Sequence, residues 1–278
     1  MAGKLLAISD LHVRYEDNRR FVEGLRPESD DDWLLVPGDV GEIFADVDWA
    51  LRLLAERFST VVWAPGNHEL WTHPRDPLGL RGEERYRALV EACRGLGVLT
   101  PEDPYPTWRT GGVEVTVAPL FVLYDYTFRA GHLTQEAALE ASYEAGVVCT
   151  DEFLLHPDPH PSLDAWCRSR LDLTEARLAE LPAGRPIVLV NHFPLIRRPT
   201  EVLRHPEFAL WCGTEATADW LRRYRVVAAV YGHLHIPRLL TQDGVPHYEV
   251  SLGYPREWQP RGSAPGLTTI LPQLALVG

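Results

Sequence analysis

The sequence of 278 residues lacks any apolar run long enough to cross a membrane. Its first apolar run, residues 5–8, is interrupted by Asp10, which comes far too early for a secretory signal peptide. With 45% hydrophobic residues, the chain can nevertheless bury a sizeable core. We therefore expect a soluble cytoplasmic protein.

The chain is also poor in cysteine and in lysine. Its four cysteines form neither a paired zinc-binding spacing nor a dense disulfide framework, so we expect them to be reduced thiols. Lys4 is the only lysine, and the formal net charge is −12. Nonspecific nucleic-acid binding depends mainly on a basic face, so this charge disfavours a general nucleic-acid binder. A local site can still be positive.

Strand-like and helix-like patterns alternate in the first hundred residues. Apolar residues recur at helical spacing between residues 47 and 58 and again between 86 and 96. This β-α-β order favours a partly parallel sheet with helices on its outer face. We expect one domain over residues 1–278. Residues 121–182 change in character, with aromatic, acidic and proline-rich segments, and we interpret them as an insertion that shapes the substrate side.

Further elements are predicted after residue 100. Residues 113–118 are typical of a strand, whereas 163–181 and 214–224 have helical patterns. Two short apolar segments, 238–242 and 246–251, flank Asp243-Gly244, a pair typical of tight hairpin turns. We expect a β-hairpin there.

Five short polar motifs each follow a strand-like apolar run. The runs span residues 5–8, 33–36, 60–64, 187–190 and 226–231. The motifs that follow them are Asp10-Leu11-His12, Gly38-Asp39, Gly66-Asn67-His68-Glu69, Asn191-His192 and Gly232-His233-Leu234-His235. Metal ligands need rigid supports that hold them at fixed angles, so they tend to lie where strands end. Together the motifs supply oxygen and nitrogen ligands for two metal ions.

The spacing inside the motifs fits such ions. Residues two apart in an extended segment point to the same side, so Asp10 and His12 can reach one ion, while His233 and His235 reach neighbouring ones. The two oxygens of Asp39 can bridge cations about 3.5–4 Å apart. Two divalent ions bring roughly +4, and two aspartates with a bridging hydroxide leave about +1. That residual charge suits an anionic phosphate ester.

The ordered set Asp-x-His, Gly-Asp, Gly-Asn-His-Glu, His and Gly-His-x-His, spread over residues 10–235, resembles the calcineurin-like metallophosphoesterase superfamily. The resemblance implies an α/β fold, namely a four-layer α/β/β/α sandwich with two mixed sheets and the ions at the strand ends. The sequence departs from the family pattern at Asn191, where many relatives carry a second histidine.

The same resemblance implies a role for each motif. One metal would be held by Asp10, His12, Asp39 and His235. The other would be held by Asp39, Asn67, His192 and His233. His68 falls on the family's proton-donating histidine, and a neighbouring imidazolium can protonate a leaving oxygen near neutral pH.

We therefore expect a metal-dependent phosphoric ester hydrolase. It would hydrolyse phosphate mono- or diesters of a small molecule by attack of a metal-bridging hydroxide. Two divalent or mixed-valence ions, manganese, iron or zinc, suit oxygen and nitrogen donors without thiolate. One alternative is a nuclease or protein phosphatase of the same fold, which the acidic balance disfavours. The other is a non-catalytic scaffold, which has no need of a full ligand set.

The candidate substrate residues have an alternative role at the surface, because arginine is mostly exposed on proteins. Arg14 and Arg197 follow ligand motifs closely enough for a guanidinium to reach a phosphate oxygen. Tyr124, Asp125 and the segment 253–256 either line the pocket or pack a loop. Their aromatic content suits an organic leaving group. The expected partner is a small-molecule phosphate ester rather than a membrane or a nucleic acid.

Two glutamates, Glu42 and Glu69, lie beside predicted ligands in the sequence. Histidines that bind metals usually donate their second ring N–H to a carboxylate or carbonyl. Both glutamates are therefore candidates for that supporting role.

Overall fold

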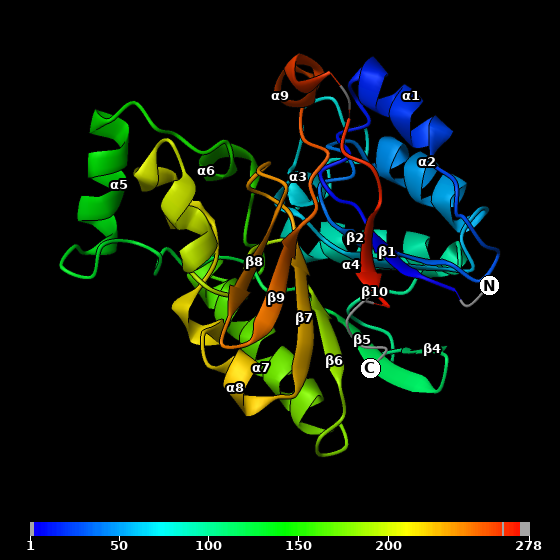
Figure 1. The fold of residues 1–278 in the computed structure, drawn as a ribbon. Helices are drawn as coiled ribbons and strands as arrows, with labels where there is room; N and C mark the ends of the chain where they lie inside the picture. Colours follow the sequence, from blue (N-terminus) through cyan, green and yellow to red (C-terminus); the bar gives the residue numbers. More distant parts are fainter. Residues whose placement is uncertain (1–2, 263, 273–278) are drawn as a thin grey trace.

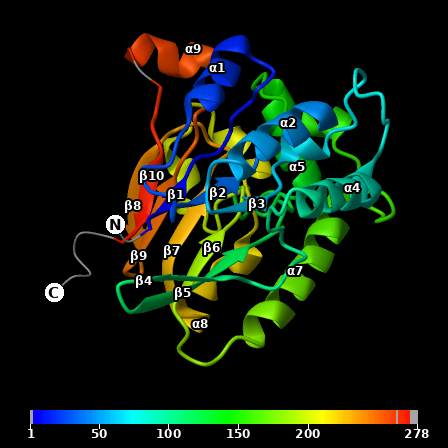
Figure 2. The same cartoon turned by 90° about the vertical axis from the view of Figure 1, so that its right-hand side faces the viewer.

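The computed structural model describes residues 3–262 and 264–272. Two β-sheets pack face to face, and helices cover their outer faces (Figures 1 and 2). Both sheets are mixed, so the expected four-layer α/β/β/α arrangement is confirmed. In the part of the chain that the structure describes, no helix combines the length and apolar character that a membrane span requires.

The first sheet has the strand order β10-β1-β2-β3. Its strands are β10 (Thr268–Leu271), β1 (Leu5–Ala7), β2 (Trp33–Pro37) and β3 (Thr60–Ala64). Strands β1, β2 and β3 are parallel, with Leu5 beside Trp33 and Trp33 beside Thr60, while β10 is antiparallel to β1. Because parallel strands in this register end at the same edge, the loops that follow the three strands lie together.

The second sheet has the order β4-β5-β6-β7-β9-β8. Its strands are β4 (Thr107–Thr110), β5 (Val113–Pro119), β6 (Ile187–Val190), β7 (Val226–Tyr231), β8 (Arg238–Gln242) and β9 (Val245–Glu249). The four central strands are parallel, and β4 and β8 are antiparallel at the edges. The predicted hairpin is confirmed, because Asp243 and Gly244, with φ of 51° and 77°, turn β8 into β9.

The helices form the two outer layers and a lobe beside them. They are α1 (Glu16–Gly24), α2 (Phe44–Ala55), α3 (Asn67–Leu70), α4 (Gly82–Gly95), α5 (Gln135–Glu144), α6 (Asp151–Leu154), α7 (Leu163–Ala179), α8 (Trp220–Arg223) and α9 (Pro255–Trp258). Helix α2 packs on β3, and α8 packs on β7. Helices α5 and α6 lie to one side, at the left of Figure 1.

Alternation along the strands explains the layers. In β1, Leu5 and Ala7 belong to the apolar cluster between the sheets, whereas Leu6 and the next residue, Ile8, belong to the cluster shared with the helices. Strand β6 divides in the same way, with Val188 facing the other sheet. Continuous apolar runs are therefore required here, because both faces of each strand are buried.

The predicted helix over residues 214–224 is wrong as one element. The structure instead has a 3-10 turn, Glu215–Thr217, followed by the short helix α8. Thr214 caps the turn through its hydroxyl, and the hydroxyl of Thr217 donates to the carbonyl of Leu195 (2.6 Å). Threonine hydroxyls compete for backbone groups in this way and interrupt regular helices.

Residues 121–182 contain three helices with different surroundings. Helix α7 belongs to the outer layer, since Trp166, Cys167 and Leu171 are buried in the cluster shared with the sheets. Helices α5 and α6 lie beyond that layer, and the segment that joins them approaches the ends of the strands. The four cysteines, one of which is in α7, are buried and free of disulfides.

Candidate metal centre

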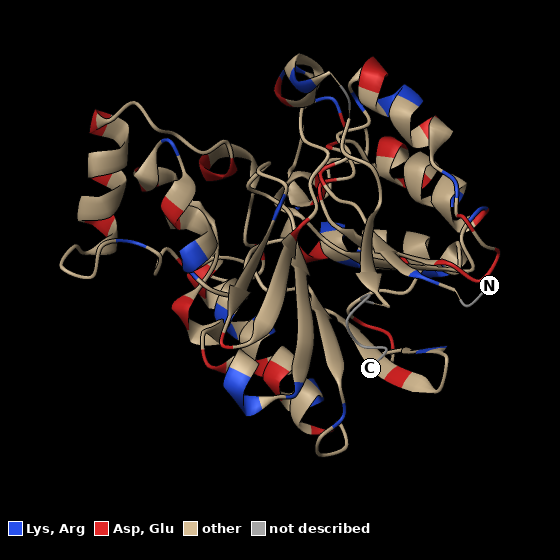
Figure 3. Ribbon diagram, viewed as in Figure 1, with Lys and Arg blue, Asp and Glu red and all other residues tan. Residues whose placement is uncertain are grey.

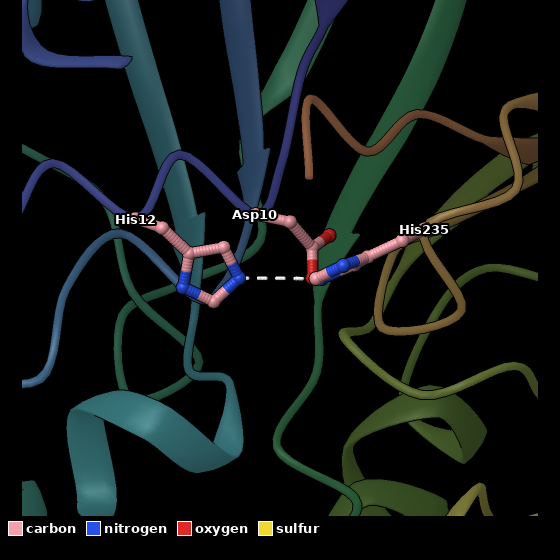
Figure 4. Close-up of side chains that lie close together, drawn as sticks. All are labelled: Asp10, His12 and His235. Atoms are coloured by element: carbon pink, nitrogen blue, oxygen red, sulfur yellow. Dashed lines mark hydrogen bonds and ion pairs between the residues drawn. The ribbon is translucent and has the colours of Figure 1, made fainter. Parts of the chain in front are cut away.

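Three predicted ligands converge at the end of strand β1. Asp10 and His12 follow β1, and His235 follows β7. The Nε2 atom of His235 is 3.0 Å from Asp10 Oδ1 and 3.2 Å from Nε2 of His12. Figure 4 shows the two rings approaching the carboxylate from either side. Three donor atoms within 4.8 Å of one another can share one cation.

A second group of donors lies next to the first. Asp39, His192 and His233 also offer ligand atoms within 4.8 Å of one another. The Nε2 atom of His192 is 3.0 Å from Asn67 Oδ1 and 3.5 Å from Asp39 Oδ1. The other oxygen of Asp39, Oδ2, is 4.0 Å from Nε2 of His12. Asp39 therefore lies between the two groups, with one oxygen toward each.

Most of these ligand candidates have positive φ, a backbone conformation that non-glycine residues rarely adopt. In the described residues, seven non-glycine residues have positive φ, and five of them are ligand candidates. Those five are Asp10 (52°), His12 (40°), Asp39 (54°), His233 (68°) and His235 (54°). Such conformations cost about 1–3 kcal/mol each and persist where the surroundings enforce them, commonly at functional sites.

The glycines of the motifs allow the loops to approach closely. A Cβ on Gly66 would collide with the carboxylate of Asp39, and one on Gly232 would collide with that of Asp10. Gly38 has φ of 76° and faces the backbone of Gly66. Only glycine fits at these three positions, because a side chain would occupy the space of a ligand or of the neighbouring loop.

Buried polar groups hold the ligand loops in place. Glu69 accepts hydrogen bonds from the backbone N–H groups of Asp39, Val40 and Gly66, at 2.8–3.0 Å. Its carboxylate thereby joins the loops after β2 and β3. Asp10, which also contacts the other members of its ligand group, accepts a hydrogen bond from the Ser251 hydroxyl at 2.7 Å. We expected from the sequence that Glu69 would support a histidine, but its carboxylate instead binds backbone N–H groups.

Burial makes four of the ligand candidates suited to cation binding. Burial lowers the pKa of His12 and of His192 to about 4, so both rings are neutral and keep a free lone pair. Burial also raises the pKa of Asp39, and the nearby Asp10 adds to that rise. The Nε2 atom of His233 is buried without a hydrogen-bond partner among the described residues. Buried lone pairs and crowded carboxylates, all oxygen and nitrogen, are the donor set that a pair of divalent cations fits.

His68 lies beside the shared aspartate. Its Nδ1 is 3.2 Å from Glu42 Oε1, and its Nε2 is 3.7 Å from Asp39 Oδ2. Burial lowers the pKa of His68, while the hydrogen bond with Glu42 opposes that fall. The ring packs against Trp71, with centroids 3.6 Å apart. Glu42 thus supports the histidine as the sequence suggested, and leaves Nε2 directed toward the ligand groups.

A cavity of about 520 Å³ opens above these groups. We call its ligand side the cavity floor, formed by Asp39, Asn67, His68, His233 and His235. We call a second group of lining residues the cavity wall, namely Val147, Val148, Leu203, Arg204 and Phe208. The wall is largely apolar and comes from residues between α5 and α6 and from the segment after β6.

The four substrate candidates Arg14, Tyr124, Asp125 and Arg197 are absent from the residues that line this cavity. Tyr124 is fully buried, and Asp125 instead accepts a hydrogen bond from Thr214. The segment 253–256 does reach the cavity, through Tyr254 and Arg256. Sequence reasoning missed Arg204 and Phe208, because neither belongs to a motif or a regular pattern.

Basic and acidic residues are interspersed over the fold, and the view of Figure 3 contains no continuous basic stripe in the described residues. Arg204 and Arg256 are therefore local cations at the cavity in a chain of net charge −12. A charge distribution of this kind favours a small anionic group at the cavity over an extended polyanion.

Comparison with known proteins identifies the family. Residues 3–237 match the model of the calcineurin-like phosphoesterase family. The chain belongs to that family. Its members are divalent-metal hydrolases of phosphoric esters, so this calcineurin-like phosphoesterase is a phosphoric ester hydrolase, as expected.

Two similar proteins extend the comparison. The [acyl-carrier-protein] phosphodiesterase PptH of Mycobacterium tuberculosis is 51% identical over 269 residues, covering 96% of this chain and 83% of the relative. The crystal structure of phosphopantetheinyl hydrolase (PptH) from the same organism has a TM-score of 0.96 at 50% identity, covering 98% of this chain and 97% of that one. This phosphoesterase thus shares its fold with that structure over nearly its whole length.

Proposed function

We propose that this protein is a two-metal phosphodiesterase that releases phosphopantetheine from a carrier protein. The observation that carries the proposal is a pair of ligand groups that share Asp39 at the base of a cavity. The name of the M. tuberculosis relative, which is 51% identical, supports the choice of substrate. The sequence led us to expect a phosphate ester of a small molecule, and this proposal specifies an ester in which that small molecule is linked to a protein.

The two ligand groups would hold the cations as the resemblance implied. The first ion would contact Asp10, His12, His235 and Asp39. The second would contact Asn67, His192, His233 and Asp39. When bound, two divalent cations lower the pKa of water and neutralise charge on the phosphate. Manganese, iron and zinc all suit these donors.

The residues of the cavity floor then account for proton transfer. His68 faces the shared aspartate and the cavity, where it can donate a proton from Nε2 to the leaving oxygen. Glu42 keeps the proton of the ring on Nδ1 through its hydrogen bond, and its negative charge stabilises the doubly protonated ring. Trp71 fixes the plane of the imidazole by packing against it.

The cavity wall suits the organic arm of the substrate. Val147, Leu203 and Phe208 offer apolar surface to a branched chain of carbon and amide groups. Arg204 and Arg256 can pair with phosphate oxygens, since a guanidinium binds phosphate with two parallel hydrogen bonds. The phosphopantetheine arm would enter the cavity through its open side, and the carrier protein would stay outside.

The test uses protein stripped of metal and reloaded with manganese, zinc or iron. Each form is incubated with a chromogenic phosphate monoester, a chromogenic diester, and a carrier protein bearing phosphopantetheine. We expect metal-dependent hydrolysis of the chromogenic diester and of the phosphodiester that links phosphopantetheine to the carrier protein. The second reaction is followed by mass spectrometry as loss of phosphopantetheine. Cleavage of the monoester alone would contradict the proposal and favour a phosphomonoesterase.

A further inference from the structure

A buried carboxylate outside the ligand motifs contacts the proposed metal centre. Asp151 begins helix α6, is 0% exposed, and lies 84 residues after Asn67 in the sequence. Its Oδ1 accepts hydrogen bonds from Asn67 Nδ2 at 2.8 Å and from Trp71 Nε1 at 2.7 Å. Among the described residues no arginine, lysine or histidine forms an ion pair with it. A buried carboxylate without a cation is costly, so its presence calls for a functional reason.

The first hydrogen bond determines the orientation of the Asn67 amide. The two ends of an asparagine amide have nearly the same shape, yet only the oxygen can bind a cation. A carboxylate only accepts hydrogen bonds, so Asp151 draws the NH₂ end of Asn67 toward itself. The oxygen end then lies on the opposite side, 3.0 Å from His192 Nε2. A flipped amide would present N–H groups to the second ion instead.

The second hydrogen bond reaches the proton donor. Trp71 donates its indole N–H to the same oxygen of Asp151, and its ring packs against His68 with centroids 3.6 Å apart. One carboxylate oxygen therefore holds a ligand amide and the aromatic support of His68 together. Its neighbours in the sequence, Cys149 and Thr150, line the cavity.

The backbone holds Asp151 in this place. Trp71 pairs with Leu155 in an isolated antiparallel bridge, and the N–H of Thr72 donates to the carbonyl of Leu154 at 2.8 Å. These bonds join α6 to the chain just after α3, so that Asp151 faces the loop carrying Asn67. Residues 121–182 thus contribute to the metal side of the cavity as well as to its wall.

We propose that Asp151 is a positioning residue, which fixes the oxygen of Asn67 toward the second metal and, through Trp71, seats the ring of His68. The inference rests on the proposed two-metal centre and adds to it a residue from outside the ligand motifs. Residues of this kind change metal affinity by about 10–100-fold when they are altered.

The experiment compares three variants with the wild type. Asp151→Ala removes both hydrogen bonds, whereas Asp151→Asn keeps a carbonyl oxygen that can accept them. Asp32→Ala is the matched control, because Asp32 is also 0% exposed and accepts backbone hydrogen bonds, but lies at the start of β2, at the opposite end from the ligands. Each protein is dialysed against limiting Mn²⁺, its manganese content is measured, and its low-temperature electron paramagnetic resonance spectrum is recorded.

We expect two coupled manganese ions in the wild type, in Asp151→Asn and in Asp32→Ala. Asp151→Ala should retain about one ion, with an uncoupled spectrum, and need roughly 10–100-fold more Mn²⁺ to bind the second. Wild-type content and coupling in Asp151→Ala would overturn the inference, and so would equal metal loss in Asp32→Ala. If Asp151→Ala fails to fold, Asp151→Ser replaces it and is judged by the same outcomes.

The wild-type measurement separates this inference from the proposed function. A wild-type protein that binds fewer than two ions contradicts the two-metal centre, and with it the role of Asp151. If the wild-type protein binds two ions and has diesterase activity, and Asp151→Ala has the same manganese content and spectrum, only the role of Asp151 is contradicted.

Discussion

The floor and the wall of the cavity differ in solvent exposure and in the interactions that hold them in place. On the floor, His233 and His68 are both 8% exposed, and Asn67 is 3% exposed. On the wall, Val148 is 49% exposed, and Arg204 is also exposed. The floor is held by strained backbone, close glycine contacts and buried hydrogen bonds. The wall is held mainly by apolar packing. The floor, which carries the groups for catalysis, is therefore rigid, whereas the wall, which contacts the substrate, is held more loosely.

Asp39→Asn should have the largest effect, because it breaks the floor at the carboxylate shared by both ligand groups. Losing several kcal/mol of charge stabilisation corresponds to a fall in kcat of about 10³–10⁴-fold. Metal content should fall with activity, measured by elemental analysis on the dialysed protein. An active Asp39→Asn protein with two ions would remove the bridging role from this residue.

Asp76→Asn tests the support beneath the floor. Arg85 is fully buried and donates to Asp76 at 2.9 Å and to the carbonyls of Glu69 and Glu42. Breaking a buried ion pair leaves an unpaired charge, so the free energy of unfolding at pH 7 should fall by about 3–5 kcal/mol. Urea denaturation of the metal-free proteins measures this difference.

That difference should depend on pH. Burial alone would raise the pKa of Asp76, but hydrogen bonds from the Phe44 N–H and from Arg85 keep it below the ordinary value of 3.8. Because the folded pKa is the lower one, the carboxylate stabilises the fold above the unfolded pKa and loses this contribution as pH falls through the folded pKa. The stabilities of wild type and Asp76→Asn should therefore begin to converge below about pH 4 and come together once the pH is below the folded pKa. A gap that stays constant down to pH 2 would contradict this assignment.

His68→Asn separates proton transfer from metal binding on the same floor. The variant should keep both ions and lose about 10²–10⁴-fold in kcat, since a positioned general acid contributes about that much. The loss should be smaller for a diester whose leaving group is already acidic, because such a group needs no proton. Unchanged rates with both substrates would show that His68 is not the acid.

Arg204→Ala should have the smallest effect, because it alters the wall alone. An exposed guanidinium that pairs with a phosphate contributes about 1 kcal/mol, so KM for the carrier-linked diester should rise about 5-fold. The kcat value and the metal content should stay close to those of the wild type. An equal loss in kcat would mean that the wall takes part in chemistry, and the contrast between the two surfaces would disappear.

Much of the floor could be predicted because its information is local. Each ligand motif directly follows a buried apolar strand, and the structure brings all seven metal candidates and His68 together at the strand ends. The role of these residues as ligands stays a prediction until an ion is seen. The positions of these strands could also be predicted from the sequence, since a strand that is buried on both faces needs a continuous apolar run.

The wall could not be predicted in this way, and neither could Asp151. Arg14 and Arg197 are close to ligands in the sequence, yet Arg204 lines the cavity instead, since the direction of a loop depends on distant packing. Asp151 is 84 residues from its partner Asn67 and belongs to no motif. The bridge between Trp71 and Leu155 and the hydrogen bond from Thr72 to Leu154 bring the two together.

The sequence by itself determined the donor types, their order and their attachment to strands, because metal chemistry and strand burial each demand particular residues at short range. The tertiary structure alone decided which oxygen faces which histidine, which groups the supporting carboxylates contact, and what surface meets the substrate. Those features depend on contacts between segments far apart in the chain, where side-chain type does not reveal the partner.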